Sequence, residues 1–166
     1  RRQRQMCIRH SYYTNFTYWT QHCWGVTCVN DMEAMLSYQP ITIGDKEQAL
    51  ADLVRCYEKM MMRSHTNGGY VNLLDECWKM CEKFHTNIVI MYDHVSCKNV
   101  GGLHGLFEDQ ARERGIHLIW IPHDVMDPRT VSRREMREAF SQYMVTVLNE
   151  KPLDPTLLDY EDALSW

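Results

Sequence analysis

Two nearly unbroken apolar runs, at 88–91 and 118–121, flank a segment whose apolar residues recur at helical spacing. Short apolar runs of this kind are typical of strands that are buried on both faces of a parallel sheet. The segment between them predicts a helix that ends at Gly115, because glycine readily forms a left-handed cap. The apolar face of that helix carries Leu103, Leu106, Phe107 and Ala111. Together these patterns predict a strand–helix–strand unit over 86–129 with a right-handed crossover.

The rest of the chain shows patterns of the same kind. We predict further helices over 11–24, 45–64, 70–84 and 132–149, and a short strand over 25–31. Two of these helices begin with a capping-box signature, Asp45 with Gln48 and Ser132 with Glu135. The order of elements predicts an α/β fold, Rossmann- or flavodoxin-like, with a parallel sheet of three to four strands and helices on both faces. We expect residues 1–11 to form a linker or polar helix and residues 150–166 to form a packed tail.

Composition narrows this picture to a single domain over 1–166. Of the 166 residues, 45% are hydrophobic and 24% are charged, which suits one ordinary globular core. A net charge of −4 gives no general attraction to nucleic acid or to anionic membranes. Because the sequence contains neither a membrane-spanning apolar run nor the apolar segment of a secretory signal, we expect a cytoplasmic protein. Its seven cysteines then indicate reduced thiols or metal ligation and not a disulfide framework.

Cys97 differs from the other cysteines because it lies in a loop and not in an apolar stripe. The loop follows the strand at 88–91, so it lies at the carboxyl edge of the sheet, where open α/β sheets bind ligands. Its position beside Lys98 and before a helix favours a thiolate, which could be a nucleophile or an iron–sulfur ligand. His123 and Asp124 follow the next strand and should reach the same edge.

The full candidate cleft consists of Ser96, Cys97, Lys98, His123, Asp124, Asp127 and Arg129. For Asp127 and Arg129, a purely structural role is an equal alternative. Asp127 or Ser132 would then cap the following helix, and Arg129 would be a solvated charge.

Other groups carry weaker signals. They are Cys77, Cys81 and His85 on one predicted helix, and His22, Cys23 and Cys28 around a predicted strand. The first group has the spacing of four that places ligands for zinc on one helix face, but buried core cysteines are the more common outcome. The second group lacks another pair of ligands nearby. The turn at 64–69 contains His65, an exposed candidate for a functional loop.

Four segments in the second half of the chain resemble a known family. They are IVIMYDHVSCK, GGLHGLFEDQ, RGIHLIWIPHDVMDPR and SRREMREAFSQYM, in that order. Together they look like the 2-hydroxyacyl-CoA dehydratase and benzoyl-CoA reductase family. The resemblance is most specific over 87–147 and extends more loosely back to about Tyr12.

The resemblance implies a larger subunit with two Rossmann-like lobes and a [4Fe-4S] cluster held by cysteines. Its Ser-Cys-Lys motif places the ligand of the C-terminal lobe on Cys97, and the other ligands would come from an N-terminal lobe outside this sequence. It further implies an acyl-CoA or aryl-CoA substrate, a homologous partner subunit in a heterodimer, and an ATP-dependent activator that donates the electron. The implied chemistry is reduction of the benzoyl-CoA ring or dehydration of a 2-hydroxyacyl-CoA.

We therefore expect a fragment, beginning at Arg1, that forms the C-terminal lobe of an oxygen-sensitive anaerobic enzyme and is inactive alone. Cys97 is its expected cluster ligand. The alternative from another class is a non-catalytic flavodoxin-like binding or assembly module. In that case Cys97 is an ordinary loop thiol and the turn at 64–69 contacts a partner.

Overall fold

The computed structural model describes residues 4–8, 14–32, 40–58, 63, 69–124, 126–127 and 129–159. Its centre is a four-stranded sheet with the strand order β2-β1-β3-β4. The strands are β1 (Arg4–Ile8), β2 (Val26–Asp31), β3 (Ile88–His94) and β4 (His117–His123). All three neighbouring pairs are parallel, which confirms the predicted α/β class with a parallel sheet.

The N-terminal strand β1 corrects the sequence prediction, which assigned residues 1–11 to a linker or polar helix. In the structure β1 pairs with β2 on one side and with β3 on the other, so it is an inner strand of the sheet. The segment Arg4–Ile8 has only three apolar residues in succession, at its end, and offers no alternation to recognise. Its strand conformation comes from the two neighbours that supply its hydrogen bonds.

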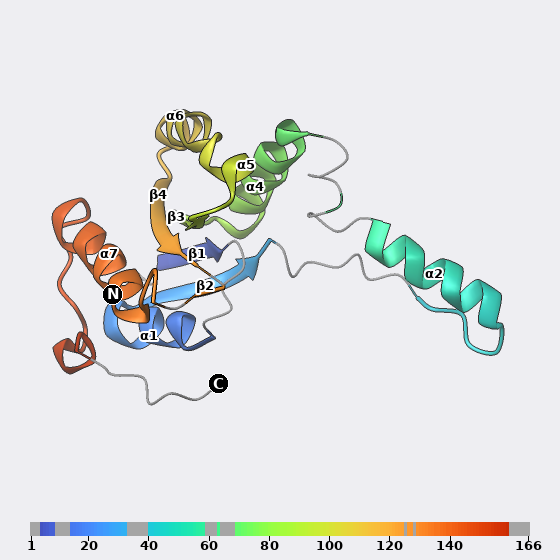
Figure 1. The fold of residues 1–166 in the computed structure, drawn as a ribbon, viewed down its shortest axis with the longest axis horizontal. Helices are drawn as coiled ribbons and strands as arrows, with labels where there is room; N and C mark the ends of the chain where they lie inside the picture. Colours follow the sequence, from blue (N-terminus) through green and yellow to red (C-terminus); the bar gives the residue numbers. More distant parts are fainter. Residues whose placement is uncertain are drawn as a thin grey trace.

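Helices cover both faces of the sheet, as predicted (Figure 1). The helices are α1 (Thr14–Trp24), α2 (Lys46–Glu58), α4 (Tyr70–Phe84), α5 (Lys98–Gly101), α6 (His104–Arg114) and α7 (Arg133–Thr146), followed by the 3₁₀ turn η1 (Pro155–Leu157). Helices α1 and α7 pack on one face, and α4, α5 and α6 pack on the other. Within the described residues, no helix is both apolar and long enough to cross a membrane.

The central strand β3 divides the core into two clusters because its successive side chains point to opposite faces. Ile88, Ile90 and Tyr92 face α1 and α7, where they meet the aromatic side chains of Phe16 and Phe140. Val89 and Met91 face the other way and join the core formed with α4, α5 and α6. Both faces of β3 are therefore buried, as its unbroken apolar sequence predicted.

The helix ends show which local signals were reliable. The capping box at Ser132 is complete, since its hydroxyl accepts from the N–H of Glu135 and the Glu135 carboxylate accepts from the N–H of Ser132. At α2 only half of the predicted box forms: Asp45 accepts from the N–H of Gln48, but the Gln48 side chain donates to Asp52 instead. Gly115 ends α6 in the left-handed conformation, as predicted.

The predicted helix between β3 and β4 is split into α5 and α6. Its residues Leu103, Phe107 and Ala111 are buried as expected, whereas Leu106 is 42% exposed. Val147 falls within the helix predicted over 132–149, but it lies beyond the end of α7 and is 51% exposed.

The C-terminal segment packs on α1. The indole N–H of Trp19 donates to the carbonyl of Leu157 (2.8 Å), and the N–H of Leu153 donates to the carbonyl of Cys23 (2.6 Å). Gly25 turns the chain out of α1 with φ +71°, and a Cβ at this position would lie 2.9 Å from Leu153 Cδ1. The glycine therefore serves both the turn and the close approach of the tail. In the described part of the tail, which ends at residue 159, Leu157 packs against the core as predicted, whereas Leu158 is 38% exposed.

Candidate functional site

The candidate site lies at the carboxyl ends of β3 and β4. The two strands run in register to their last residues, where His94 pairs with His123. Beyond them the N–H of Val95 donates to the carbonyl of His123 (3.1 Å), so the loop after β3 is fastened to the end of β4. The parallel pairing therefore brings the loop that contains Cys97 and the exit of β4, with His123 and Asp124, to one edge of the sheet.

Cys97 is the residue just before α5, in a tight turn that begins at His94. Its N–H donates to the carbonyl of His94 (2.9 Å), and its side chain is half-buried against the core formed with α4, α5 and α6. Its neighbours Ser96 and Lys98 are exposed. The thiol thus lies between the packed core and the exposed edge of the sheet. A cysteine buried within the core has no such exposed side.

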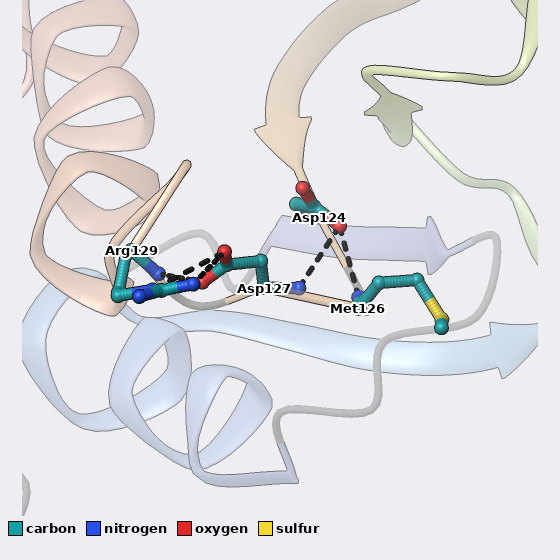
Figure 2. Close-up of polar contacts among 4 residues, drawn as sticks. All are labelled: Asp124, Met126, Asp127 and Arg129. Carbon is teal, nitrogen blue, oxygen red and sulfur yellow. Dashed lines mark hydrogen bonds and ion pairs between the residues drawn. The ribbon is translucent and has the colours of Figure 1, made fainter.

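Asp124 is the most firmly held acid of the site. It is only 7% exposed, and its Oδ1 accepts from the N–H groups of Met126 (2.9 Å) and Asp127 (3.2 Å), as Figure 2 shows. The Met126 N–H is the largest cause of a lowered pKa for this carboxyl, with smaller contributions from the Asp127 N–H, the Thr130 side chain and His94. Asp124 is therefore a fixed negative charge at neutral pH.

His123 is 4% exposed and lies beneath this edge. Its ring is 5.1 Å from that of Tyr92 and 6.0 Å from that of His94, measured between centroids. A histidine packed in this way lies below the surface at this edge of the sheet, and it is less accessible than Cys97. The sequence prediction placed His123 at the correct edge but did not foresee its burial.

Asp127 and Arg129 form a local ion pair. The Arg129 guanidinium donates to both carboxylate oxygens of Asp127, with Nη2 2.8 Å from Oδ2, and Figure 2 shows the side chain folded back on its own loop. The Arg129 side chain is 88% exposed, which agrees with a solvated charge. Of the two capping candidates, Ser132 is the residue that caps α7, as described above.

The sequence prediction missed His94, Asp93 and His104 at this edge. Nε2 of His94 lies 3.8 Å from Oδ1 of Asp124, and Nε2 of His104 lies 3.4 Å from Oδ2 of Asp93. The signal for the first two was present, since Asp93 and His94 are the polar residues that end an otherwise apolar strand. The sequence prediction ends the apolar run before these two residues and does not include them in the site.

The weaker candidates do not form sites in the structure. Cys77 and Cys81 are 0% and 2% exposed in the core on α4, while His85 is exposed at the end of that helix in a left-handed conformation. Burial raises the pKa of Cys23 to about 11, with a smaller contribution from Asp154. Burial likewise raises the pKa of Cys28 to about 11, so both thiols stay protonated at neutral pH. The exposed His22 stacks instead on Tyr18.

His65 and the rest of 64–68 lie outside the described residues. Among the residues that the structure does describe, no three His, Cys, Asp or Glu side chains are grouped closely enough to hold a metal ion. Comparisons of the chain with protein-family models, with curated proteins and with solved structures gave no match.

Proposed function

We propose that the chain is the C-terminal lobe of a subunit that performs radical chemistry on a CoA thioester, with Cys97 as one ligand of a [4Fe-4S] cluster. The observation that carries the proposal is the position of Cys97: a half-buried thiol at the carboxyl edge of a parallel sheet, next to the exit of β4. The strand order β2-β1-β3-β4 supports it, because flavodoxin-like sheets begin with this order and bind ligands at this edge.

The cysteines of the described chain can supply one ligand of such a cluster. Iron–sulfur clusters are held by thiolates. Cys23, Cys56, Cys77 and Cys81 are buried, and Cys28 lies within β2 with a raised pKa. Among the cysteines whose side chains the structure describes, Cys97 is therefore the suitable donor at this edge. Because the described residues hold no group of three ligands, the remaining ligands would come from outside them. When bound, the cluster would supply one-electron transfer to the thioester.

The surrounding residues then have separate roles. Asp124 holds the loop after β4 through its bonds to backbone N–H groups, and the half-buried Cys97 thiol is shielded on its core side. Lys98 and Ser96 are exposed beside the thiol, where a cation and a hydroxyl could contact the anionic and polar groups of a CoA ester. The substrate would be benzoyl-CoA or a 2-hydroxyacyl-CoA. A homologous subunit and an ATP-dependent activator would complete the system.

The test compares cysteines in the intact subunit. Cys97→Ser should lose much of the bound iron and of the broad visible absorbance of the cluster, because a serine hydroxyl is a far poorer iron ligand than a thiolate. Two control variants should keep their iron: Cys28→Ser, which also changes a half-buried thiol, and Cys77→Ala, which removes a core thiol. Full iron and full turnover of the CoA substrate in Cys97→Ser would overturn the proposal.

One observation favours the alternative of a non-catalytic binding or assembly module. Helix α2 exposes the apolar side chains Leu50, Leu53, Val54 and Tyr57. An exposed apolar stripe is typical of protein–protein contact. An iron and sulfide assay of the intact subunit separates the two functions, since a binding module would contain neither element.

A further inference from the structure

His94 lies three positions before Cys97 and is hydrogen-bonded to it. Its carbonyl accepts from the N–H of Cys97 (2.9 Å), which closes a turn from the last residue of β3 to the thiol. Within this turn, the N–H of Val95 donates to the carbonyl of His123 (3.1 Å). The backbone of the turn is therefore fixed at both of these points to the ends of the paired strands.

The His94 ring makes a second set of bonds within the same turn. Its Nδ1 lies 3.2 Å from the N–H of Ser96, which donates to it, and 3.0 Å from the Ser96 hydroxyl. Asn and Asp side chains make this kind of bond to the N–H two residues on in an Asx-turn. An imidazole nitrogen that accepts from an N–H carries no proton, so a neutral His94 has its proton on Nε2.

The protonated Nε2 faces Asp124, the acid just after β4 that backbone N–H groups hold in place. Nε2 of His94 lies 3.8 Å from Oδ1 of Asp124, and the two side chains are 21% and 9% exposed. Asp124 is itself fixed by the N–H groups of Met126 and Asp127. The ring thus lies between two segments. It is hydrogen-bonded to the turn that carries Cys97, and it faces Asp124 in the loop that follows the neighbouring strand at a longer distance.

We propose that His94 is a positioning residue for Cys97: Nδ1 fixes the turn by accepting from Ser96, and Nε2 faces the fixed negative charge of Asp124 at 3.8 Å. As a statement about the conformation of Cys97, this holds with or without a cluster. As a statement about iron binding, it rests on the proposed function. The role goes beyond packing, because it assigns a different task to each ring nitrogen.

Two isosteric variants separate the two nitrogens. His94→Asn keeps an acceptor close to the position of Nδ1, while His94→Gln places its amide near the position of Nε2 and removes the acceptor for Ser96. The readout is the rate at which iodoacetamide alkylates Cys97 in the iron-free chain, measured by mass spectrometry of the peptide that contains it. Alkylation of Cys28, at mid-strand in β2, serves as the internal control, and thermal unfolding verifies that each variant is folded.

We expect His94→Gln to alkylate about fivefold faster at Cys97, because the loss of one hydrogen bond changes the population of the open turn by about that factor. His94→Asn should stay within about twofold of the unmodified chain, since it retains the turn bond. Asp124→Asn should likewise stay within about twofold, since it removes the charge that faces Nε2 but leaves the turn bond in place. Cys28 should not change in any variant.

Equal rates at Cys97 in the Asn and Gln variants, or a parallel increase at Cys28, would overturn the assignment. Iron content then distinguishes this inference from the proposed function. If Cys97→Ser keeps its iron while the alkylation pattern is as expected, the cluster assignment fails and the positioning role stands. If Cys97→Ser loses its iron while His94→Gln and His94→Asn alkylate alike, the cluster assignment stands and the positioning role fails.

Discussion

Helices α4 and α2 have similar amphipathic sequences and opposite environments. In α4 the apolar stripe is in the core, with Leu73 and Cys77 no more than 1% exposed. In α2 the apolar stripe faces outward, with Leu53 41% and Leu50 63% exposed. Figure 1 shows α2 apart from the sheet, and within the described residues it makes no extensive contact with another helix or strand.

The buried residues of α2 are the charged Asp52 and Cys56, and not the residues of its apolar stripe. Asp52 is 7% exposed, and its carboxylate accepts from the N–H and the hydroxyl of Thr42 in the loop that leads into the helix, and from Gln48 on the helix itself. The comparison shows that apolar spacing determines where a helix forms but not whether its apolar face finds a partner in the same chain. The two helices should therefore respond differently to the same substitutions.

The largest expected effect is that of Leu73→Ala in α4. Removing a side chain that is 1% exposed should leave a cavity and lower the free energy of unfolding by about 2–5 kcal/mol. Urea unfolding of the full chain, followed by circular dichroism, measures this change. A loss below about 1 kcal/mol would show that α4 is not packed as the structure has it.

A smaller, local effect should follow from protonation of Asp52. The Thr42 hydroxyl, then the Thr42 N–H and Gln48, lower the pKa of this carboxyl from its usual 3.8. A lowered folded-state pKa means that the stabilisation is complete above pH 3.8 and is lost as the pH falls through the folded value. Hydrogen exchange, expressed as protection factors, should therefore show α2 losing protection relative to α4 between pH 6 and about pH 3.

The variant Asp52→Asn provides the matched control for that titration. It replaces one acceptor oxygen with an amide donor, so α2 should be less protected already at pH 6 and should lose little more on acidification. If α2 and α4 lost protection together in the unmodified chain, the carboxylate of Asp52 would not be the local tether.

The smallest effect is expected from Leu53→Ala in α2, the counterpart of the substitution in α4. Because the side chain is 41% exposed and alanine is a strong helix former, the free energy of unfolding should change by no more than about 0.5 kcal/mol. The same urea unfolding measures it. A loss of about 2 kcal/mol or more would mean that the apolar face of α2 is covered in solution.

Most of the fold could be predicted from local patterns. The strands β3 and β4 and the helix α4 were found because burial on both faces, or on one helical face, is visible in the residues themselves. β1 was not found, since its strand conformation depends on pairing with β2 and β3, which lie far from it in the sequence. The break between α5 and α6 was missed as well, because the whole segment has good helical spacing.

For the candidate site, sequence reasoning located the edge but not its contacts. The rule that ligand-binding loops follow parallel strands was enough to group Cys97, His123 and Asp124. It could not show that His123 is buried, nor that His94 bonds to Ser96, because those contacts depend on rotamers and on the register of two strands. The role proposed for Cys97 as a cluster ligand stays a prediction.

The contact between Trp19 and the tail has a consequence for the order of folding. The indole of Trp19 donates to a carbonyl 138 residues further along the chain, and the N–H of Leu153 donates to Cys23. Contacts between such distant residues are closed late, because the entropy of a long loop must be overcome before they form. The environment of this indole should therefore be among the last to become native, after the parallel strands between it and the tail have assembled. The fluorescence difference between the unmodified chain and Trp19→Phe, which removes this one of the five tryptophans, should recover later in refolding than helical circular dichroism.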